Sequence, residues 1–419
     1  MQLSVTTLLM FAGLAVMLPR EARADENPHG HDGAAGLPTA EKQVAPATSP
    51  GSPSDTVVKV KGEFSAYSDT DSVNVFTPAV EGTITNPLTG WTASGSYLVD
   101  IVSAASVDIV STASGHWVET RNAATLSGSY KPGNVGVTAA GSVSREPDYV
   151  SWTGGGIVNL ELADKTANPS FGYSYSHDTA GRKSTPFSVF SEKLARHSMN
   201  ASLELIVDPL TLVSFSLDAI LERGDQEKPY RFIPLFAPDI APTIARGASV
   251  DTVVRAAQSH TVEHTPGSRN RVAVSARVAQ RLSGSTLVLT ERVYVDDWGL
   301  KASTTDLRFV VDASRRVFMW AHLRGHFQTG VSFWRRAYSA VLGEAPSSVP
   351  TWRTGDREMS PLSAGTFGVG TRWNVGPSAR ATAWSLVAQA DLLTTVFSDA
   401  LYIESRQGYL GVLQVEAEF

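Results

Sequence analysis

Residues Tyr409 to Phe419 read YLGVLQVEAEF, and this stretch decides the fold. Its odd-numbered positions carry Tyr, Gly, Leu, Val, Ala and Phe, whereas its even-numbered positions carry Leu, Val, Gln, Glu and Glu. Alternation with a period of two predicts a β-strand whose two faces meet different environments. Such a strand suits the wall of a transmembrane β-barrel, with lipid outside and water inside. A half-buried strand of a soluble β-sandwich is the alternative.

The rest of the chain repeats this pattern from Thr56 onward. Segments of ten to fifteen residues alternate apolar and polar side chains, and residues typical of turns separate them. We therefore predict an all-β fold, a transmembrane antiparallel β-barrel of about 16 strands (roughly 14 to 18). The predicted strands are 57–67, 72–85, 91–100, 116–130, 135–145, 149–163, 170–178, 198–207, 211–222, 271–282, 286–296, 303–312, 317–327, 364–373, 380–395 and 409–419.

The connections between these segments alternate in length. After even-numbered strands they are short and contain Gly or Pro, as in Lys131-Pro132-Gly133-Asn134. After odd-numbered strands several are long, the longest being Arg223 to Asn270. Short periplasmic turns and long extracellular loops are the rule in outer-membrane barrels, so both termini are expected in the periplasm. One position fits poorly, because Glu291 follows Leu287 and Leu289 on the lipid face; a bulge or a place at the rim would explain it.

The amino-terminal region is expected to lie outside the barrel. The apolar run Leu3 to Leu18, followed by Ala22-Arg23-Ala24, indicates a signal peptide over residues 1–24. Residues 25–55 are rich in Pro, Gly, Ala and Ser, so we expect a disordered periplasmic segment that can serve as a partner-docking tail. The barrel then occupies residues 56–419. We expect Phe419, the terminal aromatic residue, to act as the signal for the barrel-assembly machinery.

Composition excludes several classes of function. The chain has no cysteine, which removes disulfides, thiolate nucleophiles and Cys-ligated metals. The net charge of −6 gives no sign of nucleic-acid binding. The sequence contains no G-x-S-x-G, H-E-x-x-H, P-loop or dinucleotide-binding motif. We therefore expect no enzymatic activity, no cofactor and no resident metal, and outer-membrane lipid as the surroundings.

Polar faces of the predicted strands supply candidates for a lumen or a constriction. Asp100, Glu119 and Arg121 would point inward near the outer end if the third and fourth strands form a hairpin. A structural ion pair is the first interpretation and a ligand contact the second. Asp108 belongs to a repeat, DIVSAAS followed by DIVSTAS, whose oxygens would suit a cation or simply bond to one another. The remaining candidates are Glu204, Asp218, Arg277, Arg308, Arg324 and Arg372.

Several of these segments also resemble a known family. The pieces are Val73 to Pro78 (VNVFTP), Gly95 to Asp100 running into VSAAS, and Glu119-Thr120-Arg121. Together they resemble an uncharacterised family of predicted bacterial outer-membrane β-barrel proteins, a domain of unknown function, most clearly over residues 62–130. The resemblance implies the barrel and its location in the outer membrane. It implies no activity, substrate or site residues.

Two functions remain open at this level. The first is a passive channel or uptake pore for a small polar solute, with the 224–270 loop folded into the barrel mouth because it holds the apolar stretch Phe232 to Ala241. The second is a non-conducting, plugged barrel that acts as an anchor or partner of periplasmic or surface machinery. Charges of both signs on the inward faces suit either function.

Overall fold

The computed structural model describes residues 56–104, 117–228, 231–341, 348–375 and 383–419. Sixteen antiparallel strands form a closed barrel, in which β1 (Val57–Asp69) pairs with β19 (Ser405–Glu418). This confirms the predicted fold class and strand number. The predicted signal peptide, the predicted disordered segment and Asp108 lie outside the described residues.

The strands between β1 and β19 follow one another around the barrel in chain order, apart from three short strands that lie in loops. They are β2 (Val73–Asn86), β3 (Trp91–Ala104), β4 (Trp117–Tyr130), β5 (Val135–Glu146), β6 (Tyr149–Leu160), β7 (Ala167–Ala180), β8 (Glu192–Asp208), β9 (Thr211–Gly224), β12 (Ser268–Leu282), β13 (Ser285–Asp296), β14 (Lys301–Asp312), β15 (Val317–Gln328), β17 (Leu362–Val375) and β18 (Ala383–Phe397).

The two faces of the wall differ as the alternation predicts. On β1, Val60 and Phe64 point outward and are 43% and 56% exposed, whereas Glu63 and Ser65 point inward and are 3% exposed. A strand has a side-chain period of two, so the register of each pair carries this division to the next strand. The outward face is apolar over most of its area, and the inward face carries the charged side chains.

Glu291 is a carboxylate on the outward face in the middle of its strand, and our explanation for it is wrong. The register of β13 with β12 and β14 runs without a bulge, and Glu291 lies in the middle of its strand rather than at the rim. Two hydroxyls of β14 donate to its carboxylate instead, Ser303 to Oε1 at 2.6 Å and Thr305 to Oε2 at 2.5 Å. Local hydrogen bonds therefore accommodate this carboxylate without a change in register.

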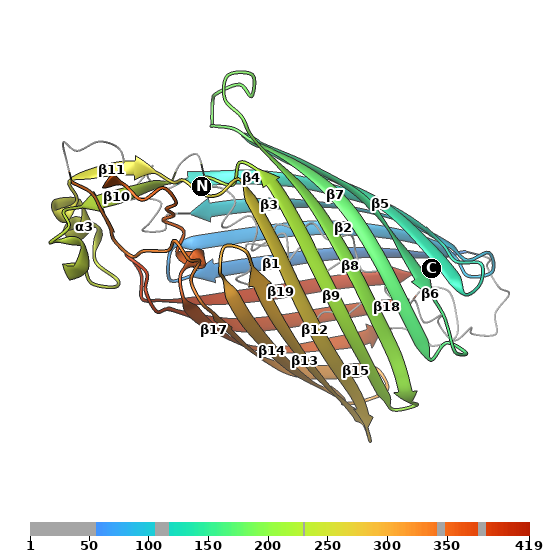
Figure 1. Ribbon diagram of the computed structural model, residues 1–419. Coiled ribbons are helices and arrows are strands. Elements are labelled where there is room, and N and C mark those ends of the chain that lie inside the picture. Colours follow the sequence, from blue (N-terminus) through green and yellow to red (C-terminus); the bar gives the residue numbers. More distant parts are fainter. Residues whose placement is uncertain (1–55, 105–116, 229–230, 342–347, 376–382) are drawn as a thin grey trace.

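The two ends of the barrel are unlike. The turns after β2, β4, β8, β12 and β14 are short and lie at one end, which we call the turn end; the long connections lie at the other, the loop end. The C-terminus lies at the turn end, as the alternation of short and long connections predicts (Figure 1). Among the described residues, no helix has the length and apolarity to cross a membrane.

Two long loops carry secondary structure that the alternation pattern did not predict. The connection from β9 to β12 holds β10 (Phe232–Phe236), the 3-10 helix η2 (Ala241–Thr243), α3 (Val250–Ala256) and β11 (Ser259–Val262). The connection from β15 to β17 holds β16 (Tyr338–Ser339) and the 3-10 helix η4 (Arg357–Met359). Strands β11, β10 and β16 form a small sheet, and β10, β11 and α3 project beyond the ends of the barrel strands (Figure 1). We call β10, η2, α3, β11 and β16 together the cap.

Candidate functional site: the lumen and its cap

Charged side chains of alternating sign line the lumen near the loop end. The Nε atom of Arg121 on β4 lies 2.6 Å from Oδ2 of Asp100 on β3, and the hydroxyl of Thr77 donates to Oδ1 of the same carboxylate at 2.6 Å. Asp100 and Arg121 are directly opposite in register. Asp100 is fully buried and Arg121 is 2% exposed. The pair predicted from the sequence is thus present, and its depth suits a structural role.

The same arrangement continues along the wall from β7 to β12. Arg196 on β8 contacts Asp178 on β7 at 3.3 Å and Glu222 on β9 at 2.9 Å. The second oxygen of Glu222 lies 2.8 Å from Nη2 of Arg271 on β12. Each buried charge is therefore next to an opposite charge on the neighbouring strand, which offsets the cost of removing it from water. We call Asp100, Arg121, Asp178, Arg196, Glu222 and Arg271 the ionic girdle.

Inward-facing charges become more exposed toward the turn end. Glu222 in the girdle is 1% exposed. Asp218, four residues nearer the turn end on the same strand, has a side chain that is 25% exposed. At the turn end, the side chains of Lys59 and Arg281 are each 43% exposed. The girdle side chains near the loop end are thus covered, whereas Lys59 and Arg281 at the turn end are reached by water.

The other predicted candidates all lie on inward-facing positions, because they share the alternation of their strands with residues already placed inside. Asp218 accepts from Asn200 at 2.6 Å and from Arg292 at 2.9 Å. Arg372 lies 3.7 Å from Glu416 across β18. Glu204 is half-buried on β8. Arg277, Arg308 and Arg324 lie half-buried on β12, β14 and β15. Their role in a constriction remains a prediction.

The apolar stretch of the 224–270 loop is buried, and its partners are other loops. Phe236, Ala241, Ile244 and Val253 pack with Leu401 from the connection between β18 and β19. Ile233 and Leu235 pack with Tyr338 and Ala340 from the connection between β15 and β17. The sequence predicts the loop in the mouth because an apolar stretch that is exposed to water is costly. The hydrophobic core inside the cap already removes this stretch from water, so the place of the loop in the mouth stays a prediction.

A different segment reaches the inward-facing side chains of the rim. We call residues 354–360, which contain η4, the strap. Arg357 contacts Asp71 in the turn after β1 at 2.5 Å, and Glu358 contacts Arg406 on β19 at 3.1 Å. The amide of Gln328 on β15 donates to the carbonyls of Glu358 and Ser360. The strap therefore joins the cap to the mouth on the side of β15, β19 and β1.

Sequence reasoning missed the strap and four of the six girdle residues: Asp178, Arg196, Glu222 and Arg271. Arg196, Glu222 and Arg271 lie next to the long connections. The sequence therefore carried no sign that their side chains pair with one another across neighbouring strands. The signal for their inward position was available: Glu222 and Arg271 are the terminal residues of the predicted strands 211–222 and 271–282, and Arg196 continues the inward alternation one step before residue 198. The strap had no such signal, because its position depends on contacts across more than 280 residues of chain, from Arg357 to Asp71.

Three buried carboxylates near the girdle are close enough to share a cation. Oxygens of Glu119, Glu146 and Asp148 lie within 4.8 Å of one another. A hard cation such as Ca²⁺ takes oxygen ligands of this kind. Crowded acidic groups also occur without a metal, and nothing else in the described part of the chain indicates an ion there. We leave this cluster unassigned.

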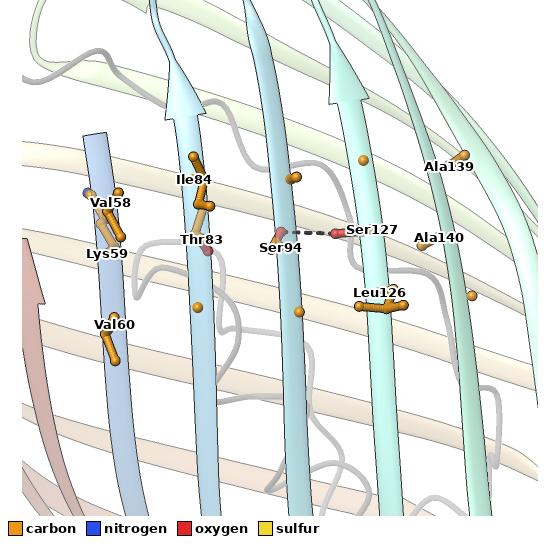
Figure 2. A pocket seen from close by; sticks show the side chains of 15 residues that line it. Val58, Lys59, Val60, Thr83, Ile84, Ser94, Leu126, Ser127, Ala139 and Ala140 are labelled. Atoms are coloured by element: carbon orange, nitrogen blue, oxygen red, sulfur yellow. Dashed lines mark hydrogen bonds between the residues drawn. The ribbon is translucent and has the colours of Figure 1, made fainter. Parts of the chain in front are cut away.

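A groove of about 760 Å³ lies on the wall formed by β1 to β5 (Figure 2). Outward-facing Val60, Ile84 and Leu126 border it, and small residues such as Gly82 and Gly141 form its floor. Leu126 is 73% exposed because its neighbours in register are glycines. Inward-facing residues of the same strands, among them Lys59, Ser94 and Ser127, also line the groove.

A closed antiparallel barrel with an apolar outer face and a charged lumen is a β-barrel of the transmembrane class. The chain belongs to the family described as protein of unknown function (DUF3570), whose model matches residues 111–415. This confirms the family resemblance seen in the sequence, but over a different stretch: of residues 62–130 the match includes only 111–130, with Glu119-Thr120-Arg121, and it continues to residue 415.

Solved structures with a similar arrangement are outer-membrane proteins. OccK5 (OpdH) of Pseudomonas aeruginosa is 7% identical with a TM-score of 0.42, covering 87% of this chain and 98% of that one. OccAB1 of Acinetobacter baumannii is 10% identical with a TM-score of 0.41, covering 88% and 98%. The siderophore receptor PirA of Pseudomonas aeruginosa is 10% identical with a TM-score of 0.39, covering 88% and 81%. No curated protein matches the chain.

Proposed function

We propose that the protein is a channel of the bacterial outer membrane that admits a small polar solute. The carrying observation is the gradient of exposure along the lumen, from buried charges in the girdle to side chains such as Lys59 and Arg281 that are 43% exposed. A barrel of sixteen strands is wide enough for an aqueous passage. Charged side chains that keep contact with water are the usual lining of such a passage.

The apolar outer face supports the location, because lipid tolerates few charged side chains there. In this proposal the loop end faces the medium and the turn end faces the periplasm. The signal peptide over 1–24, assembly through Phe419 and a periplasmic partner bound by 25–55 remain proposals that accompany the location.

The cap and the strap would control the outer opening. The strap is held by two ion pairs to the rim, Arg357 with Asp71 and Glu358 with Arg406. The 224–270 loop contributes through Arg231, whose Nη1 lies 2.8 Å from Asp356 at the start of η4. In this proposal the loop holds the strap in place, and the strap narrows the mouth.

Single-channel conductance in a planar bilayer tests the function. The purified full-length protein is compared with Arg357→Ala, which removes one attachment of the strap. We expect steady conductance that rises or opens more often in Arg357→Ala. Arg246→Ala is the matched control. Arg246 forms an exposed ion pair with Glu404 at 3.4 Å, and neither residue belongs to the strap.

The absence of cysteine allows a second, stricter test. Cysteines replacing Asp71 and Arg357 can be joined by a bifunctional thiol reagent, which fixes the strap on the rim. We expect crosslinking to abolish the conductance and a cleavable linker to restore it on reduction. If crosslinking does not change the conductance, the strap does not control the opening, and only the channel function itself is supported.

The second candidate function is a plugged barrel that anchors other machinery. The burial of the girdle and the cap favours it, since both close the loop end. It predicts no conductance in the full-length protein or in Arg357→Ala, and conductance only after deletion of residues 225–267. That result would favour the plugged barrel over the channel.

A further inference from the structure

Three cationic side chains face outward at the loop end, on a wall whose charged residues mostly face inward. Arg145 on β5, Lys193 on β8 and Arg223 on β9 are exposed, and each is the second residue from the loop end of its strand. Val143, on the same face as Arg145, is 54% exposed, whereas Glu222 beside Arg223 faces the lumen and is 1% exposed. We call Arg145, Lys193 and Arg223 the outer cations.

No carboxylate on the same face balances these charges. The structure describes β5 to β9 without a gap, and the loop-end half of each strand carries any Asp or Glu on inward positions. Asp225, in the loop after β9, accepts from the backbone N–H of Lys193 at 3.0 Å. Arg223 donates through Nη1 to two neutral oxygens, a backbone carbonyl at 2.6 Å and a side-chain amide at 2.9 Å. The positive charge of this surface is therefore open to an anion outside the protein.

A cluster of aromatic and imidazole rings faces outward next to the outer cations, further from the loop end. The ring of Trp152 on β6 lies 5.4 Å from that of Tyr175 and 6.0 Å from that of His177, both on β7. The ring of His197 on β8 lies 5.1 Å from that of Tyr175, and its Nδ1 is 2.8 Å from the hydroxyl of Tyr173. Rings with an apolar body and a polar edge collect where lipid headgroups meet acyl chains. The ring cluster therefore indicates that the outer cations lie at the height of the headgroups.

The spacing of the outer cations fits two anionic groups. Arg223 pairs in register with Ala195, two residues from Lys193, so Arg223 and Lys193 are diagonal neighbours, roughly 7–8 Å apart. Side chains as long as these can meet on one phosphate. Arg145 and Lys193 lie on one line of register partners that runs across β6 and β7, and three strand spacings separate them by roughly 14 Å. Arg145 therefore suits a second phosphate.

We propose that the outer cations and the ring cluster bind a lipid that carries at least two phosphate groups, with Lys193 and Arg223 on one phosphate and Arg145 on the other. Charge complementarity favours this lipid, because a neutral headgroup would leave three cations without a counter-charge. Its acyl chains would lie along apolar outward residues of the same strands, such as Val143 and Met199. The surface is on the outside of the barrel, so it does not require an open lumen.

Two forms of one glycolipid isolate the contribution of the second phosphate. Lipid A carries two phosphates, and monophosphoryl lipid A carries one on the same sugar and acyl framework. Binding of each to the full-length protein in an uncharged detergent is titrated by native mass spectrometry. We expect lipid A to bind about fivefold more tightly, because one basic residue near an anionic lipid surface contributes about that factor.

Variants then assign the binding to residues. The double variant Lys193→Gln and Arg223→Gln should weaken the binding of lipid A about tenfold or more, because two charges are lost from one phosphate. Arg145→Gln should lower the affinity for lipid A to that for the monophosphoryl form and leave the latter unchanged. Lys301→Gln is the matched control, since Lys301 is exposed at the loop end of β14, beside outward Val295 and outside β5 to β9. Far-UV circular dichroism checks that each variant folds.

Three outcomes would overturn the proposal. Unchanged affinity for lipid A in the double variant removes the site. Equal affinity of the intact protein for the two lipids removes the lipid class, because the second phosphate then makes no contact. A loss in Lys301→Gln as large as in the double variant means that any surface cation serves. Conductance should be the same in all these variants, so the channel and the lipid site stand or fall separately.

Discussion

Arginine–carboxylate pairs occur at both ends of the lumen, but they are buried at the loop end and exposed at the turn end. In the girdle, Arg196 lies between Asp178 and Glu222, and all three side chains are 7% exposed or less. At the turn end, Arg281 contacts Asp312, but their side chains are 43% and 23% exposed. A buried pair costs much to break and an exposed pair costs little. The comparison teaches that charge in this lumen is structural where it is buried and keeps its contact with water where it is exposed.

The largest effect should come from breaking the girdle. Arg196→Ala leaves Asp178 and Glu222 buried without their shared cation, which should lower the free energy of unfolding by about 3–5 kcal/mol. Urea unfolding followed by tryptophan fluorescence measures it. Arg281→Ala is the matched control and should cost about 1 kcal/mol or less. Equal losses in the two variants would mean that the ends do not differ as the burial indicates.

The loop end should also respond to alkaline pH through the cap. Burial raises the pKa of Tyr338 to about 12, and its hydroxyl donates to the carbonyls of Phe333 and Thr354. The folded protein then holds this proton more tightly than the unfolded chain, whose tyrosine has a pKa of about 10. The contribution is complete below pH 10 and is lost as the pH rises toward 12, by about 2 kcal/mol.

Protease sensitivity of the cap across this pH range checks the prediction. In Tyr338→Phe the titrating group is gone, so the cap should lose this part of its pH dependence. A cap that opens at the same pH with and without the hydroxyl would assign the change to another group.

A smaller effect should appear where the wall meets the wetter part of the lumen. A Cβ at Gly370 on β17 would overlap the indole ring of Trp320, which lies against that glycine from β15. Gly370→Ala should therefore cost at least about 1 kcal/mol, the lower bound for overpacking, because Trp320 is buried and its ring must move. Gly411→Ala on the outward face meets nothing within 4 Å and should be neutral. Thermal unfolding in detergent compares the two; a larger loss at Gly411 would contradict the assigned faces.

Much of the fold was readable from local pattern. The alternation in Tyr409 to Phe419 recurs in each barrel strand, and lipid outside with water inside requires it. Turn residues such as Pro132 and Gly133 marked the short connections. The loop elements were not readable in the same way. Strands β10 and β16 pair in parallel over two residue pairs, too few for a periodic signal.

The residues of the candidate site also differ in whether local pattern could reveal them. Asp100, Glu119 and Arg121 were found because one hairpin register brings them near one another. Arg196 was missed because its importance depends on two acidic partners, on β7 and β9, that no single hairpin contains. Glu291 was misjudged because its hydroxyl partners come from the next hairpin.

The sequence by itself determined that the chain forms a barrel, how many strands it has and which side chains face inward. Those properties follow from a period of two and from turn chemistry, which are local. Tertiary structure alone decided which inward charges are buried, which loops cover one another and that Arg357 meets Asp71 at the mouth. Burial and long-range pairing depend on which strands become neighbours when the barrel closes, and no local pattern contains that information.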